Sequence, residues 1–192
     1  MALQDTLTAV PPVPFIFLRH GETDWNKNRL AQGQTDTLLN ASGRDQAASA
    51  VPLLNGHKLT RIVSSPLKRA YETAEIVNRS LGLPITRHSG LVERSFGQHE
   101  GKPWFSGFVD AELETMELVS DFSVRIFKAL SEILDRYPEP VLIVSHGGVF
   151  RVFTQALCGL EDARAANSVP FRLDPPGESS SWWHLTPVDP VR

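Results

Sequence analysis

Residues 15 to 26 read FIFLRHGETDWN, and this stretch decides how the rest of the chain is interpreted. Four apolar residues, Phe15 to Leu18, follow Pro14 and precede a glycine, which is typical of a strand buried in an α/β sheet. Arg19 and His20 come where that strand ends, and open α/β sheets bind ligands beyond the carboxyl ends of their strands. The arginine offers a planar fork of donors for phosphate or carboxylate, and its charge disfavours the imidazolium form of the histidine. Taken alone, these residues fit a surface Arg-His pair after an edge strand as well as they fit a ligand site at the end of a buried strand.

A second apolar strand ends in the same way, because residues 141 to 145 are followed by His146, Gly147 and Gly148. Two buried strands that each end in His-Gly can point two imidazole rings at one place. Between them, residues 62 to 70 (IVSSPLKRA) predict a strand, a turn and the start of a helix that carries a second arginine, Arg69.

Three segments together resemble the signature of the histidine phosphatase superfamily, which contains the cofactor-dependent phosphoglycerate mutases and their phosphatase relatives. The segments are Leu18 to Thr23, Ser64 to Ala74 and Ser145 to Gly148. Each is a weak signal alone, but they come in the family's order, and the similarity covers roughly residues 13 to 173.

Apolar strands alternate with helices along the chain, which predicts an α/β layer fold with a largely parallel sheet. The resemblance implies a phosphoglycerate mutase-like three-layer α/β/α sandwich with a mostly parallel, mixed central sheet. We expect helices with Ser42 as an N-cap, after Ser65-Pro66, from Val119 and from Gly147. We expect further strands at residues 59–64, 84–87, 141–145, 168–173 and 182–185, and a loop at 91–104.

The chain of 192 residues is long enough for one sizeable core and too short for two ordinary domains. We therefore expect a single histidine phosphatase domain over residues 1–192. Residues 1–12 form a polar, proline-bearing leader, which we expect to be loose. Residues 93–118 are expected to form an acid loop and a short segment that caps the substrate.

Composition excludes several classes of function. A net charge of -3 gives no indication of nucleic acid or an acidic membrane surface as a partner. The single Cys158 excludes an intrachain disulfide and a multi-cysteine metal site. Neither a secretory signal nor an apolar run of roughly 20 residues is present, so we expect a cytoplasmic enzyme with a small-molecule substrate. The oligomeric state stays open, with a dimer as one option.

Phosphoryl transfer needs an in-line nucleophile, cations for the equatorial oxygens and a proton donor for the leaving oxygen. The resemblance assigns the nucleophile to His20, which would become a phosphohistidine. It places Arg19, Arg69 and His146 around the phosphoryl oxygens. Their charge would replace the metal ion of many other phosphatases, so we expect neither a metal nor another cofactor.

Three further residues are candidates for the phosphate pocket. Asn26 matches the family's asparagine after the first signature and could donate its amide to the phosphoryl group. Gln32 is a candidate by position only. The amide of Gly147, at the start of a helix, is a natural donor to an anion.

The resemblance assigns the proton donor to Glu93. The family carries this residue in a Leu-x-Glu segment with a glycine four residues later, and Leu91, Glu93 and Gly97 match that pattern. Glu93 would protonate the leaving alkoxide and then activate the water that attacks the phosphohistidine. Without the resemblance, a loop ion pair of Glu93 with Arg94 or Arg87 is the simpler explanation of the residue.

Two departures from the family bear on function. His99 replaces the tryptophan of the family's Gly-x-Trp-Glu-Gly pattern and could change the packing under the acid loop or touch the substrate. The segment Lys102 to Leu118 is shorter than the insertion of the mutases, which indicates an open pocket and favours phosphomonoester hydrolysis. The alternatives are a phosphoglycerate mutase-type phosphomutase and a catalytically weak relative that binds phosphorylated ligands.

Overall fold

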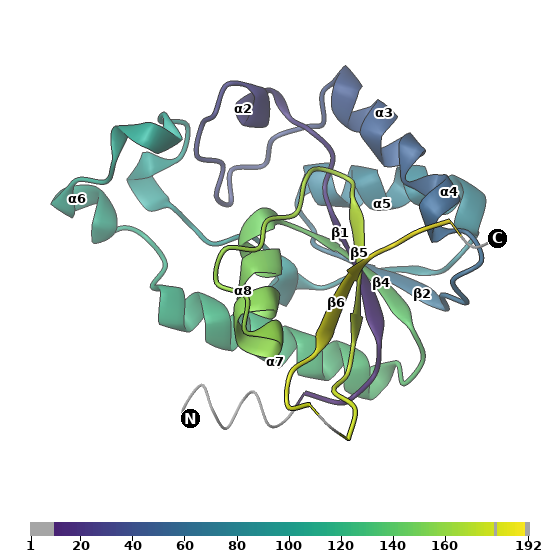
Figure 1. Ribbon diagram of the computed structural model, residues 1–192. Coiled ribbons are helices and arrows are strands. Elements are labelled where there is room, and N and C mark those ends of the chain that lie inside the picture. The colour runs from purple at the N-terminus through teal and green to yellow at the C-terminus, as the bar shows by residue number, and fades with distance from the viewer. Residues whose placement is uncertain (1–9, 179, 191–192) are drawn as a thin grey trace.

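A six-stranded sheet forms the centre of the computed structural model, which describes residues 10–178 and 180–190 (Figure 1). Most of the expected leader, residues 1–12, lies outside the described residues. The strand order is β3-β2-β4-β1-β5-β6. The strands are β1 (Phe15–Arg19), β2 (Arg61–Ser64), β3 (Ile85–Arg87), β4 (Val141–Ser145), β5 (Pro170–Asp174) and β6 (His184–Pro187).

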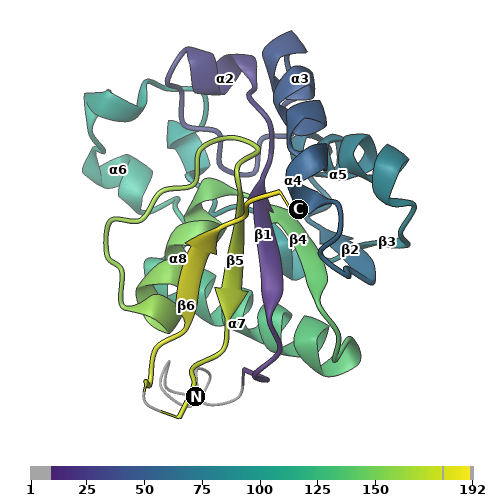
Figure 2. The same cartoon turned by 45° about the vertical axis from the view of Figure 1, so that its right-hand side comes forward.

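Strands β3, β2, β4 and β1 run parallel to their neighbours, and β5 and β6 extend the sheet antiparallel beside β1 (Figure 2). The mixed, mostly parallel sheet expected for the family is thereby confirmed. In the pairing of β1 with β4, Arg19 lies opposite Ser145, and the His20 amide donates to the Ser145 carbonyl at 2.9 Å. The residues that follow the two strands, His20 and His146, therefore emerge at the same edge of the sheet.

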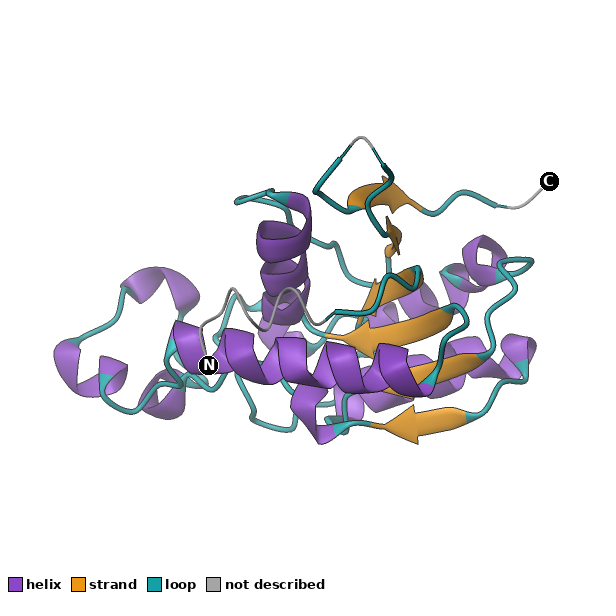
Figure 3. Cartoon of the chain, turned by 90° about the horizontal axis from the view of Figure 1, so that it is seen from below, coloured by secondary structure: helices purple, strands orange, loops and turns teal. Residues whose placement is uncertain are grey.

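Helices cover both faces of the sheet, which gives the three layers (Figure 3). Alternate side chains of β1 enter opposite cores: Phe15 and Phe17 pack with α7 (Val119–Arg136) and α8 (Gly147–Cys158). Ile16 and Leu18 pack on the other face with α4 (Val51–Leu54) and α5 (Lys68–Leu81), and α3 (Ala41–Ser49) packs in turn against α5. Strands buried on both faces explain the continuous apolar runs of the sequence.

Some helix ends differ from the expectation. Asn40, not Ser42, caps α3, because the backbone of Asn40 is extended and its side chain accepts the Gly43 amide at 2.8 Å. The helix is interrupted at Ala50, and α4 places Pro52 in its first turn, where proline is tolerated. The next helix, α5, begins at Lys68, later than Pro66 suggested.

Short helical turns lie within or at the ends of residues 91–104, the stretch expected to be a loop: η1 (Ser89–Leu91), η2 (Gly97–His99) and η3 (Trp104–Ser106). A short helix, α6 (Asp110–Leu113), follows them. With α2 (Asp24–Lys27), they lie beyond the end of the sheet that carries His20 (Figure 1). Within residues 10–178 and 180–190, no helix has the length and apolar character needed to cross a membrane.

Candidate active site

His20 is buried and held in one orientation. Its Nδ1 lies 2.7 Å from the carbonyl oxygen of Gly21. Because a carbonyl can only accept, Nδ1 carries the proton and Nε2 keeps a lone pair. Burial, followed by the charges of Arg69 and Arg19, holds the pKa of His20 well below its usual range. The ring is therefore neutral near pH 7, which suits a nitrogen nucleophile.

His146 faces His20, with 5.3 Å between the ring centroids. Its Nε2 lies 2.8 Å from Ser65 Oγ, which also accepts the Leu67 amide at 3.3 Å. The hydroxyl group of Ser65 can donate its proton to Nε2, and on that basis we assign the proton of the neutral His146 ring to Nδ1. Burial and the charge of Arg69 lower the pKa of His146 well below its usual value, so this ring is also neutral.

Two arginines, the half-buried Arg19 and the buried Arg69, supply positive charge beside the histidines. Arg19 donates from one terminal nitrogen to the Ala165 carbonyl at 2.9 Å. Arg69, only 1% exposed, donates to the carbonyls of Gly33 at 2.7 Å and Thr35 at 2.8 Å. Burial lowers the pKa of Arg69 to about 10, and it also lowers the pKa of Arg19. Arg69 therefore remains a cation near neutral pH.

Three nitrogen atoms around His20 have no hydrogen-bond partner within the described part of the chain. They are Arg19 Nε, Arg69 Nε and His146 Nδ1, and all are buried. A buried donor without a partner is costly, and most such groups in proteins are satisfied. Three unsatisfied donors from different elements, two of them cationic, indicate a site built for an anion.

Glu93 is fixed against the start of α8. Its carboxylate accepts the Gly148 amide at 2.9 Å and the Arg94 amide at 2.9 Å. A Cβ atom on Gly148 would lie 2.2 Å from Glu93 Oε1, so this close approach requires glycine. The loop ion pair considered above is not formed: Arg94 Nε donates to the Glu117 carbonyl, and Arg87 lies over the Tyr71 ring.

The remaining candidates lie nearby with differing partners. The Asn26 side-chain oxygen accepts the Thr23 amide in a capping box at the start of α2. Gln32 is buried, and its side-chain oxygen accepts from the Thr37 hydroxyl at 2.8 Å. Gly147 is the first residue of α8, and a Cβ atom there would lie 3.5 Å from the Arg19 guanidinium. The roles predicted for these three residues in binding phosphate stay predictions.

Sequence reasoning missed Glu100, which supports the loop that holds Arg69. Its carboxylate accepts the amides of Gln34 at 3.0 Å, Thr35 at 2.9 Å and Phe96 at 3.0 Å. This carboxylate joins the acid loop to residues 33–35, whose carbonyls bind Arg69. The glutamate of the Gly-x-x-Glu-Gly pattern was the available signal.

The His99 departure affects packing. His99 is 1% exposed, and its Nδ1 lies 2.7 Å from a carboxylate oxygen of Glu112 on α6. Lys102 forms an ion pair with the other oxygen of that carboxylate. These contacts, first that of Lys102 and then that of His99, lower the pKa of Glu112 to about 2. His99, which stands in the place of the family's tryptophan, thus anchors α6 and with it residues 102–118, called the capping segment below.

Comparisons with known proteins agree with this geometry. Residues 15–171 match the profile of the Histidine phosphatase superfamily (branch 1). The chain is 36% identical over 159 residues to the uncharacterized phosphatase PhoE of Bacillus subtilis, covering 79% of this chain and 82% of that protein. It is 33% identical over 159 residues to the probable phosphoglycerate mutase GpmB of Salmonella choleraesuis, covering 74% of each.

A solved structure extends the likeness to the fold. A mycobacterial glucosyl-3-phosphoglycerate phosphatase in complex with VO3 aligns with a TM-score of 0.78 and 28% identity, covering 91% of this chain and 98% of that one. The sheet order, the paired histidines and the profile match lead to one conclusion. The chain belongs to the histidine phosphatase superfamily (branch 1), whose members work through a phosphohistidine.

Proposed function

We propose that His20 is the nucleophile and Glu93 the proton donor in the hydrolysis of a phosphomonoester. The observation that carries this assignment is the set of three buried donors without partners, Arg19 Nε, Arg69 Nε and His146 Nδ1, around a neutral His20. A phosphoryl group bound there would satisfy all three donors and face the lone pair of His20 Nε2. Its equatorial oxygens carry the charge that the arginines neutralise.

The reaction proceeds in two displacements. In the first, the lone pair of His20 Nε2 forms the N–P bond while the P–O bond to the alcohol breaks. The alcohol oxygen keeps that electron pair and takes the proton of the Glu93 carboxyl group. In the second, Glu93 accepts a proton from water, the water oxygen bonds to phosphorus, and the N–P pair returns to His20. A bound phosphate dianion disfavours the neighbouring carboxylate, so the substrate itself favours the protonated acid.

Hydrolysis is favoured over phosphoryl transfer back to the substrate. A mutase must keep water from its phosphohistidine until the acceptor is phosphorylated again. Here the segment Lys102 to Leu118 is short, and several of its apolar side chains are exposed, including Phe105 at 77%. A segment this exposed supports access of water to the phosphoenzyme. Relatives bear both names, phosphatase and probable mutase, so the mutase reaction is the outcome to exclude.

Phosphate release from a panel of phosphomonoesters tests the assignment. His20→Ala should lower turnover by roughly 10⁴-fold or more, as expected when a covalent nucleophile is removed. His184→Ala, at an exposed position of β6, is the matched control and should keep full activity. Wild-type activity should also survive excess chelator, because Arg19 and Arg69 would supply the positive charge that a metal ion supplies in many other phosphatases.

Other results would change the proposal. Turnover retained by His20→Ala would show that His20 is not the nucleophile. Loss of activity with chelator would show that the reaction needs a metal ion. Isomerisation of a phosphoglycerate without phosphate release would identify a mutase. Binding of phosphate without turnover of any ester would leave only a binding protein. The expected cytoplasmic location, small-molecule substrate and absence of nucleic-acid and membrane partners stay predictions, and the oligomeric state stays open.

A further inference from the structure

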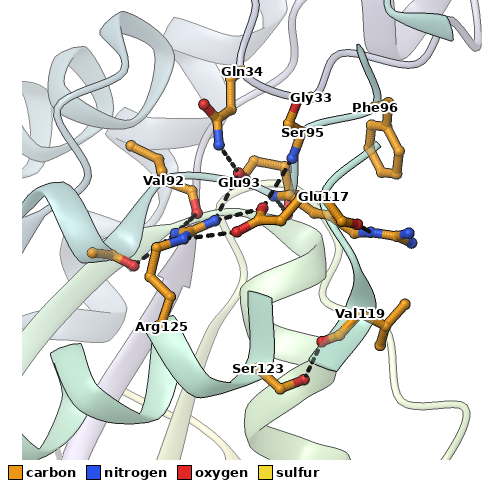
Figure 4. A network of polar contacts seen from close by, with 12 residues as sticks. Gly33, Gln34, Val92, Glu93, Ser95, Phe96, Glu117, Val119, Ser123 and Arg125 are labelled. Carbon is orange, nitrogen blue, oxygen red and sulfur yellow. Dashed lines mark hydrogen bonds and ion pairs between the residues drawn. The ribbon is translucent and has the colours of Figure 1, made fainter. Parts of the chain in front are cut away.

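Arg125, near the start of α7, uses every donor of its guanidinium group (Figure 4). Nε and one terminal nitrogen donate to the two carboxylate oxygens of Glu117 at 2.9 and 2.8 Å. The other terminal nitrogen donates to the carbonyls of Gly90 and Val92, both at 2.9 Å. The fifth donor reaches the Glu93 carbonyl at 3.3 Å. An arginine has five N–H donors, so none is left for substrate.

Glu117 holds the other side of the same loop. Its carboxylate accepts the Ser95 amide at 3.2 Å, and its own amide donates to the Ser95 carbonyl at 3.1 Å. Its carbonyl accepts from Arg94 Nε at 2.8 Å. Arg125 and Glu117 together therefore contact residues 90 and 92–95, with Glu93 in the middle.

The loop needs such support because its backbone has no regular hydrogen bonds of a helix or a sheet. Residues 92–96 lie in no helix or strand between η1 and η2. Backbone carbonyls in such a segment must find partners elsewhere, and here one guanidinium binds two of them, those of Val92 and Glu93, together with the Gly90 carbonyl of η1. The pair is bidentate, and the side chains of Arg125 and Glu117 are only 25% and 18% exposed. A partly buried, bidentate guanidinium–carboxylate pair is weakened less by solvent screening than an exposed one.

We propose that the Arg125–Glu117 pair is the positioning device of the acid: it sets the place of the Glu93 carboxyl group for proton transfer. The inference rests on the proposed role of Glu93 and concerns the same step, in which that carboxyl proton moves to the leaving oxygen as the P–O bond breaks. Neither residue touches the reacting atoms. A displacement of about 1 Å at a catalytic group can cost on the order of 10²-fold in rate.

Leaving-group dependence separates positioning of the acid from general damage. A 2,4-dinitrophenyl leaving group departs readily as an anion, whereas a phenyl leaving group needs the proton. The measurement is the pre-steady-state burst of phenol release, which reports formation of the phosphohistidine before water attacks. For Arg125→Lys, we expect the burst rate to fall by about 10²-fold with phenyl phosphate and by less than about threefold with the dinitrophenyl ester. Affinity for orthovanadate should not change, because His20 and the arginines around it are untouched.

Two further variants keep the outcomes distinct. Arg136→Lys, on the same helix but away from the loop, is the control and should behave as wild type. Glu93→Gln is run beside it: if this variant shows no preference for the better leaving group, the acid assignment itself fails. If Glu93→Gln discriminates and Arg125→Lys does not, or if Arg125→Lys slows both esters equally, the positioning role alone is wrong. Should Arg125→Lys fail to fold, Glu117→Gln gives the same test, because glutamine keeps the shape of the Glu117 side chain and removes its negative charge.

Discussion

The site is built from two regions that are held together by different means. Its floor, His20 and His146, is fixed by adjacent parallel strands whose register places Arg19 opposite Ser145. Its acid, Glu93, is carried on an irregular loop whose carbonyls and amides bind side chains, chiefly Arg125, Glu117 and Glu100. A floor built on the core is insensitive to single changes outside it. The acid loop depends on a few named side chains.

Outside the two histidines of the floor, the largest effect is expected at Arg69 of α5, whose charge acts on both rings. Arg69→Ala removes a buried cation and its unpartnered Nε, so we expect kcat to fall by about 10²- to 10³-fold. The measurement is steady-state hydrolysis of the best ester, with thermal unfolding as a check on the fold. Arg79→Ala, at an exposed position of the same helix, is the matched control. A rise in KM with unchanged kcat would make Arg69 a binding group alone.

A substitution at the contact between the two regions should disable the acid and spare the floor. The side chain of Gly148→Ala would lie 2.2 Å from Glu93 Oε1 and push the carboxylate away from α8. We expect turnover of phenyl phosphate to fall on the order of 10²-fold, with orthovanadate binding retained. Gly177→Ala, where a Cβ atom meets nothing within 4 Å, controls for the loss of glycine. Equal losses of turnover and vanadate affinity would mean that the two regions cannot be separated.

The same division explains what the sequence could predict. The strands that end at His20 and His146 are continuous apolar runs, and the expected sheet was confirmed because local pattern and core burial agree there. Glu93 was assigned by resemblance to a family motif, and nothing in the spacing of the chain indicated its two amide donors. Local pattern is informative where the core decides the structure.

The rest depended on contacts between residues far apart in sequence. Arg125 lies on a helix whose apolar period explains its formation, but its polar face gives no sign that it reaches the carbonyl of Gly90. Asn40 displaced Ser42 as the cap of α3, although both residue types are good caps. The choice between them depends on where the chain enters the helix, which tertiary packing sets.

The buried histidines make a prediction for stability that belongs to the floor alone. His20 has a folded pKa well below 6.5, so below that pH the unfolded chain takes up a proton that the folded protein does not. The free energy of unfolding should therefore decrease as the pH is lowered, with a slope that approaches about 1.4 kcal/mol per pH unit for each such ring well below pH 6.5. In urea unfolding, His20→Asn should reduce the decrease between pH 6.5 and 5.5 by about 1 kcal/mol, because the unfolded imidazole is already half protonated at pH 6.5. His184→Asn is the control, and an unchanged slope in His20→Asn would contradict a neutral buried ring.

The smallest effect on turnover is expected in the capping segment. Glu112 has its pKa lowered to about 2 from 4.5, so its contacts with Lys102 and His99 stabilise the segment above pH 4.5 and are lost as the pH falls toward 2. Glu112→Gln removes this charge at every pH and should speed amide hydrogen exchange of residues 102–118 at neutral pH, while turnover changes by less than about threefold. Glu114→Gln, exposed and one residue beyond α6, is the control. A large loss of turnover would show that the segment helps to hold Glu93, because Glu117 and Ser95 also join the two. The part of the chain in which a substitution lowers turnover would then begin at Glu112 and not at Glu117.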